Sequence, residues 1–315
     1  MRQIVYRVQR FDGKKQYVQE YMFAHETSKT ILWGLTQIKE TMDSSLTFVA
    51  VCRVGECGAC AVTVNGQACL ACETPLDIML ARFGDTLTIG PVNNFAVIRD
   101  LVVDWDQKVA SLKSVKPWLI PQDKCTAQSG CRQTPAEFKK IVAQNTCILC
   151  GACASQCNKL SADSSDFLDP FIFAKAEKFV ADSRDKDARA HLEPALAKGL
   201  WKCVECQECV EKCPRAVEPA ESIARLRQAS IRLGFTDNPG ARHALAFQDD
   251  ITDTGRLNEA AMAVKTEGLL KSITRLPFAL KLLRRGKLNP LHKPAPAKGI
   301  KELGAIIKAV KEAEE

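Results

Sequence analysis

Residues 147–157 read Cys-Ile-Leu-Cys-Gly-Ala-Cys-Ala-Ser-Gln-Cys, and residues 203–214 read Cys-Val-Glu-Cys-Gln-Glu-Cys-Val-Glu-Lys-Cys-Pro. Both runs follow the spacing C-x2-C-x2-C-x3-C. With this spacing, three thiolates of one run bind one iron-sulfur cube and the fourth thiolate binds a second cube. The sequence therefore predicts a two-cluster ferredoxin module in which each run lends one ligand to the cluster of the other.

This sharing rule gives two sets of four ligands. The first cluster is assigned to Cys147, Cys150, Cys153 and Cys213, and the second to Cys157, Cys203, Cys206 and Cys209. Because the sets are shared between runs, the fold of this region should depend on cluster assembly. Structural zinc sites and scattered core cysteines are the alternatives. Zinc usually takes Cys pairs or Cys/His sets, which two adjacent four-cysteine runs do not resemble.

A third constellation lies earlier, where residues 52–60 read Cys-Arg-Val-Gly-Glu-Cys-Gly-Ala-Cys. The spacing C-x4-C-x2-C, with a later fourth cysteine, is typical of a plant-type [2Fe-2S] loop. Gly55 and Gly58 suit such a loop because its N–H groups must turn toward the cluster sulfurs. The predicted ligands are Cys52, Cys57, Cys60 and Cys72. Cys69 is either a replacement ligand or a small buried thiol beside the cluster, and we expect the second role.

The pattern of apolar residues predicts the elements around these motifs. Residues 1–22 alternate as a β-hairpin with a turn at 12–14, and residues 86–103 form short strands. A helix is expected from Ser28, which can act as its N-cap, and a strand is expected over residues 46–51. Residues 61–64 should form a strand that ends in the Asn65-Gly66 turn. Further helices are predicted after Asp166 and over residues 220–233.

The connector over residues 105–140 contains Cys125 and Cys131, which fit no cluster pattern. They form either a disulfide that could act as a redox switch or a pair of free thiols. We expect free thiols, because no histidine or further cysteine lies nearby.

Composition excludes several classes of protein. The chain has 315 residues, enough for two or three domains, and its fifteen cysteines are too clustered for a disulfide scaffold. No apolar run is long enough to span a bilayer, and the charged N-terminus lacks the apolar core of a signal peptide. Residues 1–264 hold 32 Lys and Arg against 32 Asp and Glu, so the net charge of +7 arises in residues 265–315, which hold 12 against 5. A nucleic-acid partner is not expected, because the sequence shows no recognition motif.

The basic tail contains an apolar stripe at helical spacing. Pro277 should kink or split this helix. The helix either docks onto acidic headgroups or a partner subunit, or packs on its own domain. The stripe is formed by Leu269, Ile273, Leu276, Leu280 and Leu283, and the basic residues beside it are Lys271, Arg275, Lys281, Arg284 and Arg285.

A plant-type [2Fe-2S] loop followed by a two-cluster module resembles the iron-sulfur subunit of succinate dehydrogenase and fumarate reductase. The resemblance covers about residues 1–235, and its echoes include Cys-Arg-x-Gly-x-Cys-Gly-x-Cys, Leu-Ala-Cys and Cys-Ile-Leu-Cys-Gly-x-Cys. It implies an α+β fold, with a β-grasp [2Fe-2S] domain over residues 1–104 and the connector over 105–140. An all-α bacterial-ferredoxin-like domain with two cubane clusters follows over 141–235, and a basic helical extension over 236–315.

Two departures from the family pattern change what is implied. Most members lack the middle cysteine of the second run and hold a [3Fe-4S] cluster there, whereas Cys206 favours a second [4Fe-4S] cluster. The residues of the usual quinone pocket are replaced by Asn158, Ala162 and Val204. The extension, with Gly-Ala-Arg-His at 240–243 and Gly-Arg-Leu-Asn-Glu at 255–259, is similar to that of methylmenaquinol- or thiol-linked and heterodisulfide-reductase-like subunits. Their membrane-side partner is typically a cysteine-rich CCG-domain subunit.

The resemblance implies an electron-transfer subunit that relays single electrons between the FAD of a partner flavoprotein and a quinone-reactive subunit at the membrane. The expected cofactors are one [2Fe-2S] and two [4Fe-4S] clusters, with [3Fe-4S] as the alternative for the second cubane, and no substrate site is expected in this chain. The expected location is the cytoplasmic face of the inner membrane through partners, or the periplasmic face after co-export. The alternatives are an iron-sulfur subunit of a glycolate-oxidase-like or heterodisulfide-reductase-like complex, and a cluster-based redox sensor, for which no effector module is visible.

Overall fold

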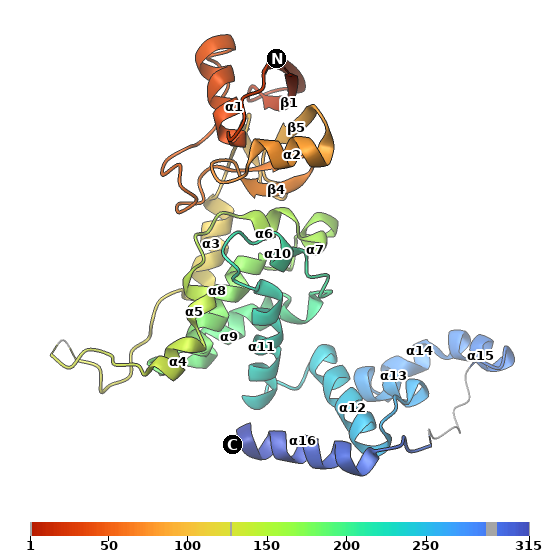
Figure 1. Ribbon diagram of the computed structural model, residues 1–315. Helices are drawn as coiled ribbons and strands as arrows, with labels where there is room; N and C mark the ends of the chain where they lie inside the picture. Colours follow the sequence, from red (N-terminus) through yellow and green to blue (C-terminus); the bar gives the residue numbers. More distant parts are fainter. Residues whose placement is uncertain (1, 127, 288–294, 315) are drawn as a thin grey trace. The chain divides into compact units, whose positions relative to one another are not determined.

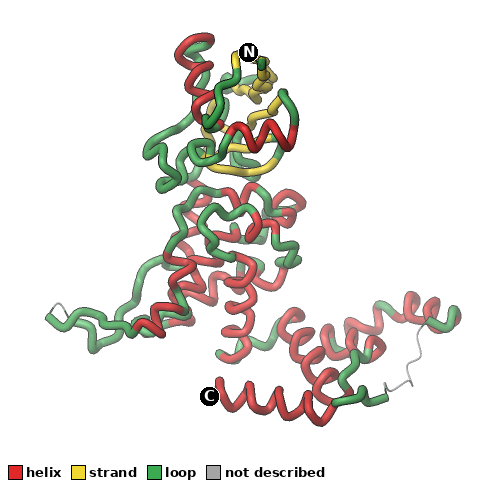
Figure 2. The backbone as a smooth tube through the Cα atoms, in the orientation of Figure 1, coloured by secondary structure: helices red, strands yellow, loops and turns green. Residues whose placement is uncertain are grey.

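The structure is a computed structural model that describes residues 2–126, 128–287 and 295–314. The chain divides into two units, residues 1–229 and residues 230–315. The first unit contains a sheet followed by short helices, and the described part of the second contains helices and loops (Figures 1 and 2). The finer division at residues 104, 140 and 235 stays a prediction.

The N-terminal strands form, within the described residues, a five-stranded sheet in the order β2-β1-β5-β3-β4 and a two-stranded sheet of β6 and β7. The first two strands pair antiparallel over their full length, which confirms the predicted hairpin, and β1 pairs parallel with β5. The Asn65-Gly66 turn joins β3 and β4 as predicted. The bounds are β1 (Gln3–Phe11), β2 (Gln16–Ala24), β3 (Ala61–Val64), β4 (Gln67–Leu70), β5 (Thr86–Gly90), β6 (Val97–Arg99) and β7 (Val102–Val103).

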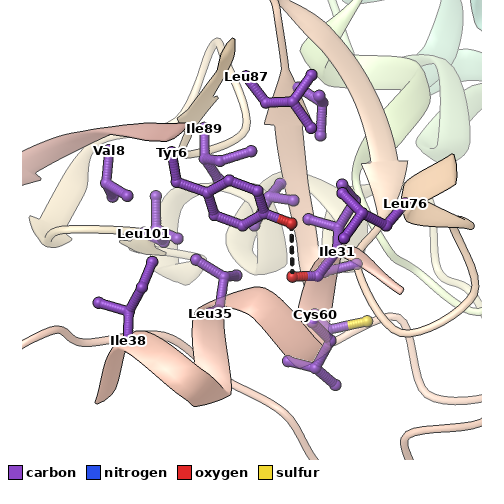
Figure 3. Packing of buried hydrophobic residues seen from close by; sticks show 14 of the residues in the cluster. Tyr6, Val8, Ile31, Leu35, Ile38, Cys60, Leu76, Leu87, Ile89 and Leu101 are labelled. Atoms are coloured by element: carbon purple, nitrogen blue, oxygen red, sulfur yellow. Dashed lines mark hydrogen bonds between the residues drawn. The ribbon is translucent and has the colours of Figure 1, made fainter. Parts of the chain in front are cut away.

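The core of this domain lies between the sheet and α1 (Ile31–Gln37), with α2 (Leu76–Phe83) beside it. Alternate residues of β1 point inward, so Ile4, Tyr6 and Val8 are fully buried while their neighbours are more exposed. The Tyr6 hydroxyl donates to the Ile31 carbonyl at 3.5 Å (Figure 3). A mixed sheet crossed by a helix is the expected β-grasp arrangement.

Two local predictions in this domain are wrong. The N-cap of α1 is Thr30, whose hydroxyl accepts from the Trp33 amide, and not Ser28, which lies outside the helix with its amide bound to Asp77. Residues 46–51 form a loop and not a strand. In this loop the Thr47 amide donates to the Asp100 carboxylate at 2.8 Å, and this side-chain partner takes the place of a neighbouring strand.

The rest of the first unit is mostly helical, as predicted. Helix α8 packs against α5, α6 and α9. The prediction of helix after Asp166 corresponds to α8, and that over residues 220–233 to α11. The bounds are η1 (Ile38–Met42), α3 (Asp106–Ser114), α4 (Pro135–Lys139), α5 (Val142–Asn145), α6 (Ala152–Ser155), α7 (Asn158–Ala162), α8 (Pro170–Val180), α9 (Ala188–Ala197), η2 (Leu200–Lys202), α10 (Glu208–Glu211) and α11 (Pro219–Arg232).

The connector corrects the prediction of free thiols at residues 125 and 131. Cys125 and Cys131 form a disulfide, with their Cα atoms 4.9 Å apart. The intervening turn explains this short distance, because the Gly130 amide donates to the Thr126 carbonyl at 2.8 Å. The turn brings the two cysteines within the range that a disulfide requires without help from any third thiol.

The second unit consists of helices and loops in its described residues. Its buried side chains include Ala241, Ala246 and Met262, which lie on α12 and α13. The predicted effect of Pro277 is confirmed, because the chain breaks at Arg275 between α14 and α15. Among the described residues, no helix is both long and apolar enough to cross a membrane. The bounds are α12 (Pro239–Thr254), α13 (Glu259–Glu267), α14 (Leu269–Thr274), α15 (Leu276–Arg284) and α16 (Ile300–Glu314).

Candidate functional site

The loop over residues 52–60 turns its backbone amides toward cysteine sulfurs. The Gly55 amide donates to Cys72 Sγ at 3.2 Å, and the amides of Glu56 and Cys57 donate to Cys52 Sγ at 3.3 Å. Gly55 and Gly58 have φ values of 76° and 74°, a left-handed conformation in which glycine is not strained. These hydrogen bonds fit the sequence argument that N–H groups of this loop turn toward sulfur, and the Gly55 amide is one of them.

The four predicted [2Fe-2S] cysteines lie together. Cys60 interacts with Cys72 and Cys57, and Cys52 interacts with Cys57. Burial raises the pKa of the Cys60 thiol to about 12, and the proximity of Cys72 and Cys57 contributes. In contrast, hydrogen bonds from the Val54 backbone and Cys57 lower the pKa of Cys52 to about 7.

Cys69 lies apart from this ring of four thiols. It is on β4 opposite Val62 and packs against the hydrophobic core of the domain. Burial raises the pKa of its thiol to about 11, and its polar neighbours are Tyr6 and Thr74. These surroundings match those of a small buried thiol.

The first predicted cubane set encloses a cavity. The cavity is small, about 20 Å³, and Cys147, Cys150, Cys153 and Cys213 all line it. Burial raises the pKa of Cys153 well above its ordinary value, and the proximity of Cys150 and Cys147 raises it further. Burial likewise raises the pKa of Cys150 to about 11.

The second predicted cubane set lies together in the same way. Cys157 interacts with Cys203 and Cys206, and Cys209 interacts with all three of these cysteines. Burial raises the pKa of Cys209 to about 12, and Cys203, Cys157 and Cys206 raise it further. The Glu205 amide donates to Cys203 Sγ at 3.4 Å.

The three sets of four cysteines, here called rings, fit iron-sulfur clusters because each set offers four thiol ligands. Burial and repulsion from neighbouring thiolates make Cys60, Cys153 and Cys209 hold their protons strongly, and bound metal would favour the thiolates by supplying positive charge. Backbone amides aimed at sulfur are the hydrogen bonds that tune such clusters. Among the described residues, no three His, Cys, Asp or Glu side chains are grouped to hold a single metal ion.

The rings lie in a defined order within the first unit. A Cβ atom added at Gly58 would come within 2.9 Å of Cys150 Cα, so the [2Fe-2S] loop touches the first cubane run. The Gln156 side chain donates to the Gly66 carbonyl at 2.9 Å, and Arg215 pairs with Glu56 at 2.5 Å. Cys153 of the first set in turn interacts with Cys209 of the second. The order is therefore the [2Fe-2S] ring, the first cubane ring and then the second.

Two cations that the sequence argument missed hold the cubane runs. Lys175 Nζ donates to the Cys147 carbonyl at 3.4 Å, and Arg227 donates to the Cys203 carbonyl at 2.9 Å. Each cation therefore binds the carbonyl of the first cysteine in a run. They lie 28 and 24 residues away from those cysteines, and the cysteine spacing carries no signal for them.

The fold and the three rings define a ferredoxin-type electron carrier. Residues 4–110 match the 2Fe-2S iron-sulfur cluster binding domain, and residues 143–217 match the 4Fe-4S dicluster domain. The chain is 45% identical over 290 residues, covering 90% of it and 91% of the relative, to the 8-methylmenaquinol:fumarate reductase iron-sulfur subunit of Wolinella succinogenes. It is 40% identical over 210 residues to the fumarate reductase iron-sulfur subunit of Mycobacterium tuberculosis, covering 65% of this chain and 83% of that one.

The chain belongs to the family of iron-sulfur subunits of succinate dehydrogenases and fumarate reductases. The corresponding mitochondrial subunit of Dictyostelium discoideum is 32% identical over 232 residues, covering 71% of this chain and 80% of that one. The fold is also that of a chain in the Mycobacterium smegmatis Sdh1 complex in the apo form. That match has a TM-score of 0.67 and 21% identity, and covers 74% of this chain and 97% of the other.

Proposed function

We propose that this chain is the electron-transfer subunit of a quinone-linked succinate dehydrogenase or fumarate reductase. The observation that carries the proposal is the ordered contact of the three thiol rings, from Gly58 against Cys150 to Cys153 beside Cys209. Iron-sulfur clusters, when bound, accept and release single electrons. An ordered series of such sites suits a relay between a two-electron flavin and a quinone.

The proposed ligand sets are those predicted from the sequence. Each set lies together in the structure, which supports the proposal. The sets are Cys52, Cys57, Cys60 and Cys72 for [2Fe-2S], then Cys147, Cys150, Cys153 and Cys213 for the first [4Fe-4S], and Cys157, Cys203, Cys206 and Cys209 for the second.

The chain's residues would hold the clusters, set their environments and exclude water, and they include no group assigned to substrate. Buried alanines and Ser155 of α6 lie within the first cubane run, on either side of Cys153. Lys175 and Arg227 fix the two runs through backbone carbonyls. Burial, hydrogen bonds to sulfur and nearby positive charge are the means by which a protein sets cluster potentials.

The two ends of the series are exposed and suit two partners. At the [2Fe-2S] end, Cys57 is exposed beside Val51 and Val54, each 69% exposed. At the other end, Cys206 is exposed beside Val204, which is 66% exposed. We assign the first end to an FAD-containing flavoprotein and the second to a membrane-side, quinone-reactive subunit.

We further propose that the membrane-side partner is of the cysteine-rich CCG-domain type. The similarity to the 8-methylmenaquinol-linked relative extends over 90% of the chain, and so includes part of the extension after residue 235. Val204, Asn158 and Ala162 replace the residues of the usual quinone pocket, which supports assigning quinone chemistry to the partner. The complex would lie on the cytoplasmic face of the inner membrane, or on the periplasmic face after co-export.

The test is dye-linked succinate oxidation by the native complex, purified anaerobically through a tag on this chain. The proposal predicts activity together with a covalently flavinylated partner. Absence of both, with all clusters present by electron paramagnetic resonance, would contradict it and favour a different flavoprotein complex. A matched complex carrying Ile306→Glu is the control. Residue 306 lies far from the cysteines in the sequence, so this variant shows whether any surface substitution lowers the activity.

A further inference from the structure

The apolar stripe predicted in the tail is exposed. Side chains of Ile273 and Leu276 are 56% and 53% exposed, and those of Leu280 and Leu283 are both 44% exposed. Phe278, which is not part of the predicted stripe, is 64% exposed. Helix α15 has no buried residue. The side chain of Leu269, also part of the predicted stripe, lies outside the described residues. The alternative in which this helix packs on its own unit is therefore wrong for α15.

The charge around this stripe has one sign. Residues 268–287 contain six Lys and Arg residues and no Asp or Glu. At about 100° per residue from Leu276, the apolar side chains of α15 cover an arc that runs from Phe278 at about 200° through Leu283 to Leu280 at about 40°. Arg284, Lys281 and the following Arg285 lie on the remaining arc, between about 80° and 180°. Arg275, at the break before α15, pairs with Glu267.

We propose that α14 and α15 form a docking surface for a bilayer with anionic headgroups. Exposed leucine and phenylalanine on one side and lysine and arginine on the other are the features of a helix that lies in the membrane interface. A run of six cations without an acidic residue complements anionic lipid, and each such cation near a negative surface strengthens binding about fivefold. Nine residues of α15 suffice to lie along the interface.

Helix α16 provides a built-in contrast. It also exposes apolar residues, because Ile306 and Val310 are 60% and 52% exposed. However, its sequence mixes both charges, and Lys308 pairs with Glu312 at 3.7 Å. Exposure of apolar side chains is thus common to both helices, and only α14–α15 adds unbroken positive charge.

The proposal goes beyond the proposed function, because it concerns a surface outside the cysteine rings. It is tested by sedimenting the cluster-loaded full chain with phosphatidylcholine vesicles, with and without phosphatidylglycerol. We expect at least about tenfold stronger binding to the anionic vesicles, weakened by added salt. Leu280→Glu and the double variant Arg284→Glu/Arg285→Glu should each reduce binding at least about tenfold, and Ile306→Glu should leave it unchanged.

Circular dichroism and the cluster absorbance verify that each variant is folded and loaded. Equal binding to both vesicle types, or full binding by Leu280→Glu, would overturn the proposal. A third outcome would also overturn it: the unaltered chain binds no vesicle, and the Leu280→Glu complex loses its membrane-side subunit in detergent. The surface would then bind protein and not lipid. Succinate oxidation by the complex, measured in parallel, reports on the proposed function alone.

Discussion

The two cubane runs have the same backbone conformation but differ in their surroundings. Leu149 and Glu205 have φ values of 53° and 55°, and Gly151 and Gln207 have φ values of 78° and 64°. These residues occupy equivalent positions, each pair leading into a short helix, α6 or α10. The same cysteine spacing therefore produces the same pair of left-handed residues in both runs.

The first run is enclosed and the second is open. Residues 151–155 are all buried, whereas residues 204–207 are all exposed. A Cβ atom at Gly151 would come within 2.8 Å of the Phe95 ring, which packs against Trp105. No such neighbour constrains Gln207, whose side chain is exposed. The first run therefore makes its contacts inside the chain, and the exposure of the second is consistent with its proposed role in meeting another subunit.

The largest expected effect is that of removing a thiol from the enclosed run. Cys150→Ser should lose the first cubane cluster and much of the folded protein, because Cys153 is buried, Cys150 is half-buried, and Cys150 lies against Gly58. Cys206→Ser should alter only the second cluster, which keeps three thiols, toward a [3Fe-4S] form. Iron content and electron paramagnetic resonance of both variants check this. Equal loss of clusters in both variants would remove the distinction between the runs.

A smaller effect is expected where the [2Fe-2S] loop meets the enclosed run. Gly58→Ala and Gly66→Ala both place a side chain at a positive φ, 74° and 81°, which costs about 1–2 kcal/mol. Only Gly58→Ala also meets Cys150, at 2.9 Å, whereas nothing lies within 4 Å of a Cβ atom at Gly66. We expect Gly58→Ala to destabilise the protein by about 1–3 kcal/mol more than its control.

The apparent Tm at a fixed scan rate measures this difference, and magnetic coupling between the clusters reports whether their separation has changed. Equal losses of stability in the two glycine variants would mean that the contact between Gly58 and Cys150 contributes nothing.

The pH dependence of stability should differ between the surroundings of the two runs. Glu177 lies on α8, which packs against α6 of the enclosed run. Burial raises the pKa of Glu177 from 4.5 to about 7, although Arg225 opposes the shift. The folded state therefore keeps this proton to a higher pH than the unfolded chain does. The contribution of Glu177 to stability is therefore fully present below about pH 4.5 and is lost as the pH rises to about 7, by up to about 3 kcal/mol.

Glu177→Gln should remove this fall, so its apparent Tm should exceed that of the unaltered protein at pH 8 more than at pH 5. Glu205→Gln, at the open run, is the control, because the Glu205 side chain is 56% exposed. A Tm difference for Glu177→Gln that is the same at both pH values would show that Glu177 does not titrate in this window.

The smallest expected effect is a gain of stability at the open run. Gln207→Gly replaces a side chain held at a φ of 64° with a residue that adopts this conformation freely. The gain should be at most about 1 kcal/mol, because the flexible unfolded glycine offsets part of it. The reverse change, Gly151→Gln, should be strongly destabilising because of Phe95. Denaturation of the two variants compares them, and similar small effects would contradict the enclosure of the first run.

Cysteine spacing made the grouping of the rings predictable, because it fixes which thiols can share a centre over short loops. The hairpin was predictable from the alternation of Ile4, Tyr6 and Val8. Contacts between distant segments were not predictable. Residues 46–51 have the composition of a strand, but Thr47 finds its hydrogen bond on Asp100. The Cys125–Cys131 disulfide depends on a turn at Thr126 and Gly130, which a count of neighbouring cysteines does not reveal.

The exposure of α15 was also not predictable from the sequence. A stripe of leucines at helical spacing is compatible both with packing inside a unit and with docking outside it. Only the burial of Ala241, Ala246 and Met262, on α12 and α13, shows that buried side chains of this unit lie on other helices.

The central claim is that electrons reach the membrane-side partner only through the open cubane ring. The most direct test is succinate-to-quinone turnover by the complex carrying Cys203→Ala, with electron paramagnetic resonance verifying that the second cubane is absent and the other two clusters are present. The account predicts that quinone-linked turnover falls to background while dye-linked succinate oxidation at the flavoprotein persists. Quinone-linked turnover at the level of the unaltered complex would contradict it.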